Sequence, residues 1–137
     1  EESEVILPGE SRKYYHIFPF LRENQLKHAL AICDLIVGRA GSGTIFEVAT
    51  LGKPSILIPL PKAAQNHQFK NAYSFAQNEA SIIIEKTNFT PRFFFERVRY
   101  LFSHPNQMGK MKKAALKFSR PKAAMVIASY IVEYLKL

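Results

Sequence analysis

The sequence predicts an α/β fold: a Rossmann-like parallel sheet with helices on both faces. Short aliphatic runs alternate along the chain with helical patterns, which is typical of doubly wound sheets. The run at residues 55–59 is apolar on both faces, as in a central strand covered by helices. No repeat, low-complexity tract or Gly/Ser-rich linker divides the 137 residues, so we expect a single domain.

The first half of the chain contains two short predicted strands, each followed by a helix. Residues 14–18 are expected to form a strand, and apolar residues at helical spacing predict a helix over residues 25–33. Residues 34–37 then form a short buried strand. A helix is predicted over residues 44–51, and Gly52 stands where a glycine ends a helix.

The second half continues the same alternation after the central strand. We expect a helix over residues 66–77 and a strand over residues 81–84. A Thr-Pro pair at residues 90 and 91 is typical of a helix start and predicts a helix to residue 102. Two further helices are expected over residues 106–118 and 122–137.

Charge and composition restrict the kind of partner. Nineteen Lys and Arg against eleven acidic residues give a net charge of +8, which favours phosphates, nucleic acid or an anionic membrane surface. No apolar stretch is long enough to predict a transmembrane helix, and no secretion signal opens the chain. The single Cys33 fits a reducing compartment. Because the first residue is not Met, we expect a fragment of a longer protein.

A glycine-rich turn joins the strand at residues 34–37 to the next helix. Gly38, Gly41 and Gly43 allow positive φ and close approach of a ligand to the backbone. The following helix offers unpaired N–H groups and a partial positive charge, so the turn is a candidate phosphate site. The alternative is a turn that is rich in glycine only because it is tight.

Glu47 has two interpretations. Thr44 and Glu47 match the capping box, in which the glutamate serves only the helix start. Alternatively, a carboxylate one turn into a helix that binds a diphosphate is placed to accept the hydroxyl groups of a ribose. The helix start decides between them: an N-cap at Ser42 or Gly43 leaves Glu47 free to face a ligand.

A second polar cluster follows the central strand and consists of Gln65, Asn66, His67, Gln68 and Asn71. Neutral donors and acceptors at the carboxyl end of a strand suit a sugar. The alternative is a solvated helix start with Asn66 as its N-cap. No second His, Cys or carboxylate follows or precedes His67 at a spacing typical of metal ligands, so we expect no metal.

These pieces, in this order, resemble the donor-site stretch of the MurG-type glycosyltransferases of family 28. The resemblance rests on residues 34–48, residues 52–59, the Asn-His-Gln of residues 66–68 and the Asn-Ala of residues 71–72. It implies donor-diphosphate contacts through the backbone of Gly41, Ser42, Gly43 and Thr44. It further implies ribose contacts from Glu47, sugar contacts from His67 and Gln68 with support from Asn71, and a uracil pocket lined by Phe20 and Leu21.

The resemblance also implies an activity for a longer parent protein. That protein transfers N-acetylglucosamine from UDP-N-acetylglucosamine, with inversion, to the lipid-linked muramyl-pentapeptide precursor of peptidoglycan, without a cofactor. It is expected in the cytoplasm, on the inner face of the cell membrane. The resemblance implies that this chain is the truncated C-terminal half of a GT-B fold. We expect it to lack the first strand-helix unit of this domain and the whole acceptor domain with its catalytic base, so no catalytic residue is expected here. Gln65, where the family usually has Asp, and a longer segment at residues 22–25 depart from the family pattern.

Three other functions remain open from the sequence: the donor-binding subunit of a two-subunit transferase, a UDP-sugar hydrolase or epimerase of GT-B fold, and a basic nucleic-acid module. The mixed aromatic and basic run at residues 92–99 is the reason for the last. Its aromatic rings recur at helical spacing, so we expect them in the core and expect no nucleic-acid partner. A second basic run, with Lys110, Lys112, Lys113 and Lys117, makes an anionic membrane surface a natural neighbour.

Overall fold

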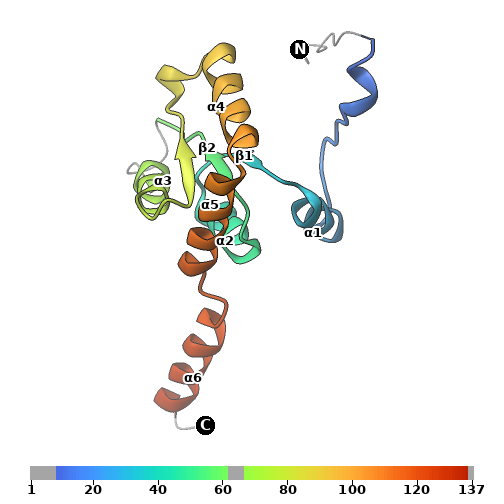
Figure 1. The fold of residues 1–137 in the computed structure, drawn as a ribbon. Helices are drawn as coiled ribbons and strands as arrows, with labels where there is room; N and C mark the ends of the chain where they lie inside the picture. The colour runs from blue at the N-terminus through green and yellow to red at the C-terminus, as the bar shows by residue number, and fades with distance from the viewer. Residues whose placement is uncertain (1–8, 62–66, 136–137) are drawn as a thin grey trace.

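The computed structural model describes residues 9–61 and 67–135, and its centre is a three-stranded parallel sheet (Figure 1). Strands β1 (Ile36–Gly38), β2 (Ser55–Leu57) and β3 (Ser81–Ile83) lie side by side in chain order. In the register, Val37 is opposite Ile56, which in turn is opposite Ile82. Parallel neighbours need a crossover connection, and helices supply both crossovers here.

Six α-helices occur in the described part of the chain: α1 (Glu23–Ile32), α2 (Ser42–Leu51), α3 (His67–Gln77), α4 (Pro91–Ser103), α5 (Pro105–Phe118) and α6 (Ala123–Leu135). Short 3-10 helices occur at Arg12–Tyr14 and Lys86–Asn88. Each predicted helix is confirmed within a few residues of its expected ends. The expected start at Asn66 and the expected end at residues 136–137 lie outside the described residues.

The central strand β2 is buried on both faces, as predicted, and its side chains divide between two apolar clusters. Leu57 packs with Val48 of α2 and Phe75 of α3 on one face of the sheet. Ile56 packs with Leu101 of α4 and Met111 of α5 on the other face. Helices therefore cover both faces, and the expected α/β architecture is confirmed.

The prediction of a strand over residues 14–18 is wrong. Tyr14 ends a 3-10 helix, residues 15–18 belong to no helix or strand, and Tyr14 and Phe18 are 77% and 63% exposed. Aromatic residues favour strands only where a neighbouring strand completes the hydrogen bonds and covers the rings. Within the described residues β1 pairs with β2 alone, so this segment has no strand beside it.

Gly52 ends α2 for two separate structural reasons. It has left-handed backbone angles, φ 59° and ψ 43°, and the N–H groups of Gly52 and Lys53 donate to Ala49 and Val48. This is the hydrogen-bond pattern in which glycine is most common. A Cβ at Gly52 would also lie 2.6 Å from Cγ of Leu116 on α5. The predicted role of Gly52 as a helix stop is confirmed.

Candidate functional site

The turn from β1 into α2 lies at the carboxyl edge of the sheet, where parallel α/β folds bind ligands. Gly41 is the N-cap of α2, and its carbonyl accepts from the N–H of Ile45 at 3.0 Å. No side chain caps this helix start. Among the described residues, the N–H groups of Ser42, Gly43 and Thr44 have no hydrogen-bond acceptor. Three free donors at the positive end of a helix dipole form an anion-binding geometry.

The glycines of this turn are not required by the fold. The positive φ that glycine allows is not used here, because Gly52 is the one described glycine with positive φ. Gly41 has φ −66° and ψ 148°, which any residue can adopt. A Cβ at Gly38 or Gly41 would meet nothing nearer than 3.9 Å or 4.0 Å, and one at Gly43 nothing within 4 Å. Within the described residues, neither a positive φ nor a close neighbour accounts for glycine at these positions, and the space beside the turn is open.

Glu47 does not take part in a capping box. Thr44 is the third residue of α2 and not its N-cap, so Glu47 lies in the second turn of the helix. Its carboxylate is exposed, and the described residues provide it with neither a hydrogen bond nor an ion pair. It lines a pocket of about 490 Å³ between α1 and α2, together with Gly43. The carboxylate is therefore free to accept hydrogen bonds from a ligand beside the helix start.

The polar cluster at the start of α3 divides into different roles. His67 is the first residue of α3 and is exposed. Gln68 accepts a hydrogen bond from the N–H of Leu60 at 3.0 Å, which fixes the chain after β2 to the start of α3. Asn71 lines a small cavity of about 70 Å³ with Ser42 of α2, so the starts of α2 and α3 meet there. Gln65 and Asn66 lie outside the described residues.

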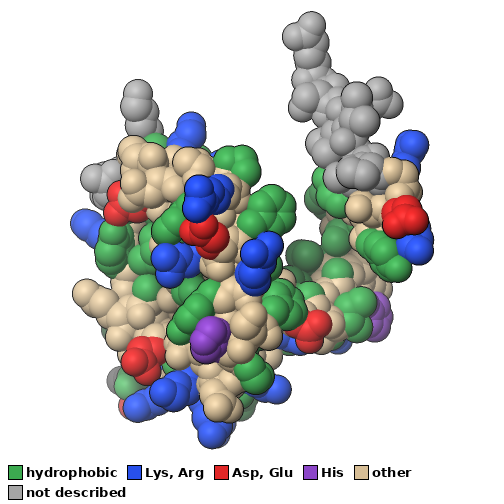
Figure 2. All heavy atoms as spheres, turned by 45° about the horizontal axis from the view of Figure 1, so that its top comes forward, with side chains coloured by type: hydrophobic (Ala, Val, Ile, Leu, Met, Phe, Trp, Pro, Cys, Tyr) green, Lys and Arg blue, Asp and Glu red, His purple; other side chains and the backbone are tan. Residues whose placement is uncertain are grey.

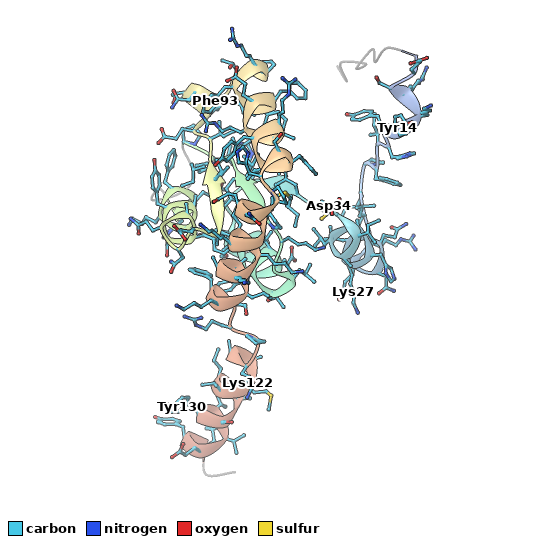
Figure 3. The ribbon with its side chains drawn as sticks, in the orientation of Figure 1. Tyr14, Lys27, Asp34, Phe93, Lys122 and Tyr130 are labelled. Carbon is cyan, nitrogen blue, oxygen red and sulfur yellow. The ribbon has the colours of Figure 1, made fainter. Side chains whose placement is uncertain are left out.

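Phe20 and Leu21 are not brought to the glycine turn. They lie in the extended segment before α1, where Phe20 is 80% exposed and Leu21 is partly buried. Neither lines the pocket between α1 and α2. Figure 3 shows α1, with Lys27 labelled, to one side of the sheet and joined to it through the segment that contains Asp34.

The sequence did not predict two side-chain hydrogen bonds, from Lys53 and Arg39, or the contribution of α1 to the pocket beside Glu47. Lys53 Nζ donates to the carbonyls of Ala31 and Cys33 at 2.6 Å and 2.9 Å, which fastens the end of α1 to the loop before β2. Arg39 Nη1 donates to the carbonyl of Ile58 at 3.4 Å. Residues of α1 complete the pocket beside Glu47: Glu23, Leu26, Lys27 and Leu30. Their spacing of three or four residues is the signal that marks one helix face.

Tyr73 on α3 and Glu85 after β3 form a hydrogen-bonded pair. The Tyr73 hydroxyl donates to the Glu85 carboxylate, which raises the pKa of Tyr73; partial burial and the charge of Glu85 act in the same direction. This pair lies beyond the end of β3 and ties α3 to the chain that follows the strand. Residues 9–61 and 67–135 contain no group of three or more His, Cys, Asp or Glu side chains placed to hold a metal. None of the helices in these two ranges has the length and apolarity to cross a bilayer.

Comparison with known proteins gives matches over most of the chain. The model of the glycosyltransferase family 28 C-terminal domain matches residues 2–127. A relative from Anaeromyxobacter sp. (strain K) is 38% identical over 120 residues, which are 86% of this chain and 31% of the relative. One from Sorangium cellulosum (strain So ce56) is 34% identical over 131 residues, which are 96% of this chain and 31% of the relative. Both are named UDP-N-acetylglucosamine--N-acetylmuramyl-(pentapeptide) pyrophosphoryl-undecaprenol N-acetylglucosamine transferase.

A solved structure agrees with the sequence matches. The crystal structure of Acinetobacter baumannii MurG superposes with a TM-score of 0.75 and 28% identity, covering 86% of this chain and 33% of that one. The chain thus spans about a third of the length of the proteins that it matches. Because the family model matches residues 2–127, which are most of this chain, the chain belongs to glycosyltransferase family 28 and corresponds to the C-terminal domain of that family.

Proposed function

We propose that this chain binds UDP-N-acetylglucosamine and forms the donor half of an inverting GT-B glycosyltransferase that acts in peptidoglycan synthesis. The names of the family 28 relatives support this donor and a lipid-linked muramyl-pentapeptide acceptor. Those relatives are about three times longer than this chain. We assign the acceptor domain and the catalytic base to the part of such a protein that this chain does not cover. The whole protein would work in the cytoplasm, at the inner face of the membrane that carries its acceptor.

The uncapped start of α2 is the observation that carries the proposal. A diphosphate at Gly41 would accept hydrogen bonds from the free N–H groups of Ser42, Gly43 and Thr44. The glycines leave open space beside those groups, so phosphate oxygens can reach hydrogen-bond distance. When UDP departs from the sugar, its growing negative charge is stabilised by the same donors and by the helix dipole.

The remaining site residues are assigned by where they lie relative to this diphosphate site, on α2, at the start of α3 or before α1. Glu47 lies one turn further into α2, and its free carboxylate accepts hydrogen bonds from the ribose hydroxyl groups. His67 at the start of α3 is assigned to hydroxyl groups of the sugar. Gln68 positions the chain after β2 through its bond to Leu60, and Asn71 supports the contact between the starts of α2 and α3. Phe20 and Leu21 remain assigned to the uracil pocket through the family resemblance alone.

Isothermal titration of the chain with UDP tests the binding half of the proposal. We expect UDP to bind, UMP to bind at least about tenfold more weakly because it lacks the second phosphate, and phosphate alone to bind weakest. Binding should not require a divalent cation. Absence of UDP binding by the folded chain, or equal affinity for UDP and UMP, would contradict the assignment of the α2 start to the diphosphate.

The proposed sugar transfer is tested on the full gene product that contains this chain. With UDP-N-acetylglucosamine and a lipid-linked acceptor, we expect transfer of the sugar with inversion at the anomeric carbon. Release of free N-acetylglucosamine, or its epimerisation in the absence of acceptor, would instead favour a hydrolase or epimerase. Product analysis with and without acceptor separates these outcomes.

A further inference from the structure

Lys53 joins the C-terminal ends of two helices, α2 through its backbone and α1 through its side chain. Its N–H donates to the carbonyl of Val48 at 3.1 Å, so the end of α2 fixes the main chain at Lys53. Its side chain extends to the other helix, where Nζ donates to the carbonyls of Ala31 and Cys33 at 2.6 Å and 2.9 Å. A single residue therefore sets how the ends of α1 and α2 lie relative to each other.

The contact between Lys53 and α1 is charged and suits the end of a helix. The last carbonyls of a helix have no partner within it, and a cation there interacts favourably with the helix dipole. Lys53 is half-buried, and within the described residues it forms no ion pair. Two of its three donors bind carbonyls at the end of α1. The charge of Lys53 therefore stabilises the end of α1 and does not neutralise a carboxylate.

Little else holds α1 against the rest of the molecule. None of its residues is buried, although Ala29 and Leu30 are half-buried. In the part of the chain that the structure describes, Lys53 provides the only hydrogen bonds that reach residues 22–33 from elsewhere. In Figure 2 the N-terminal part of the chain stands to the right of the main body and meets it along a narrow contact. The position of α1 therefore depends on the contact at its C-terminal end.

Helix α1 forms one wall of the pocket beside Glu47. Gly43 and Glu47 line this pocket from α2, and Leu26 and Leu30 line it from α1. Under the proposed function, on which this inference rests, the ligand has its phosphates at the N–H of Gly43 and its ribose at Glu47. The nucleoside of that ligand then extends along the wall that α1 provides. The diphosphate contacts belong to α2 alone.

A small tilt of α1 changes the width of this pocket. The ten residues of α1 give it a length of about 15 Å. If its C-terminal end is held, a tilt of about 10° moves its first turn by roughly 2.5 Å. The N–H groups at the start of α2 do not move with it. A displacement of this size separates the nucleoside from one wall of its pocket and leaves the diphosphate contacts in place.

We propose that Lys53 is a positioning residue for the nucleoside part of the donor. By holding the end of α1 to the end of α2, it sets the width of the pocket between the two helices. Lys53 follows the last turn of α2, whereas the diphosphate donors are in the first turn of the same helix. Its side chain therefore acts through α1 and does not touch the ligand.

Hydrogen exchange of the chain without ligand tests whether Lys53 holds α1. Lys53→Met removes the charge and the donors at nearly the same side-chain length. We expect the amides of α1 to exchange at least about tenfold faster in this variant, with the rates in α3 unchanged. Lys53→Arg keeps a charged donor group and should restore most of the protection. The matched control is Lys112→Met, because Lys112 lines the same cavity of about 220 Å³ and donates no hydrogen bond to described residues.

Titration with UDP and with inorganic pyrophosphate tests the effect on the nucleoside. Pyrophosphate contains the diphosphate but lacks the nucleoside. In Lys53→Met we expect UDP to bind about tenfold more weakly and pyrophosphate affinity to change by less than about twofold. Lys53→Arg and Lys112→Met should both keep UDP affinity within about threefold of the original. NMR titration of the amides of residues 41–44 measures both ligands at the same site.

Equal weakening for UDP and pyrophosphate would show a general disturbance of the domain and would overturn the positioning role. Unchanged exchange of α1, or unchanged UDP affinity in a variant whose α1 exchanges faster, would overturn it as well. If circular dichroism shows that Lys53→Met does not fold, Lys53→Gln takes its place with the same expected directions. Failure of the original chain to bind UDP would contradict the proposed function, and the exchange of α1 would still show whether Lys53 holds the helix.

Discussion

The two ends of α2 both carry glycine, but for different physical reasons. At the C-terminal end, Gly52 has φ 59° and a Cβ there would lie 2.6 Å from Leu116, so the fold itself requires glycine. At the N-terminal end, Gly41 has ordinary backbone angles, and a Cβ there would be 4.0 Å from its nearest neighbour. A glycine that the fold does not need, beside free N–H groups, points to a ligand. Substitution at the two ends should therefore separate stability from binding.

The largest effect is expected at Gly52. Gly52→Ala adds a left-handed alanine and an overlap with Leu116, so the free energy of unfolding should fall by roughly 2–5 kcal/mol. Urea unfolding measures this loss. Adding Leu116→Ala should recover part of it, because the overlap is removed while the backbone strain remains. A loss under about 0.5 kcal/mol would mean that the end of α2 rearranges easily.

Glu47→Gln should weaken UDP binding without changing stability. The carboxylate makes no bond within the described structure, so the free energy of unfolding should change by less than about 0.5 kcal/mol. Loss of a charge-assisted pair of hydrogen bonds should reduce UDP affinity about tenfold. Titration with 2′-deoxy-UDP is the control, since the variant should cost less there. Equal losses for both nucleotides would remove the ribose assignment.

A third helix end isolates the backbone part of the effect at Gly52. Glu79, after α3, has φ 60°, and the N–H groups of Glu79 and Ala80 donate to Ala76 and Phe75, the same pattern as at Gly52. Glu79→Gly should raise the free energy of unfolding by about 1 kcal/mol or less, because the strain of a left-handed glutamate disappears. Thermal unfolding detects such a change. A destabilised variant would show that Glu79 makes a compensating contact.

Gly41→Ser should have the smallest effect on stability. It gives the start of α2 a side-chain N-cap, which the original chain lacks. A serine N-cap accepts from the N–H groups of the first turn and is better than or equal to glycine there, so unfolding should change by a few tenths of a kcal/mol. The same hydroxyl occupies donors that the diphosphate would use. UDP titration should therefore show weaker binding from a variant at least as stable as the original chain.

The sequence predicted those features that local chemistry determines. Thr90 caps α4 by accepting from the N–H of Phe93, and Pro91 begins the helix, because both preferences act within one turn. The helix stop at Gly52 and the burial of β2 on both faces were also predicted from the sequence. The strand predicted over residues 14–18 is wrong because a strand needs a neighbour to pair with, and no described strand lies beside this segment.

The candidate site was predicted as a set of residues but not as a geometry. Thr44 and Gly41 both suit a helix start, and a shift of three residues decides whether Glu47 is an internal cap or a free carboxylate. The bond from Leu60 to Gln68 and the pocket shared by α1 and α2 depend on how separate segments pack. Tertiary contacts of this kind carry no local signal.

The most direct test of the central claim is a pair of measurements on Gly41→Asp: titration with UDP and urea unfolding. An aspartate N-cap satisfies the first-turn N–H groups with its own carboxylate and repels a diphosphate. We expect stability equal to or above that of the original chain, with UDP affinity reduced at least about 100-fold. UDP affinity unchanged in the folded variant would contradict the claim that the start of α2 binds the donor diphosphate.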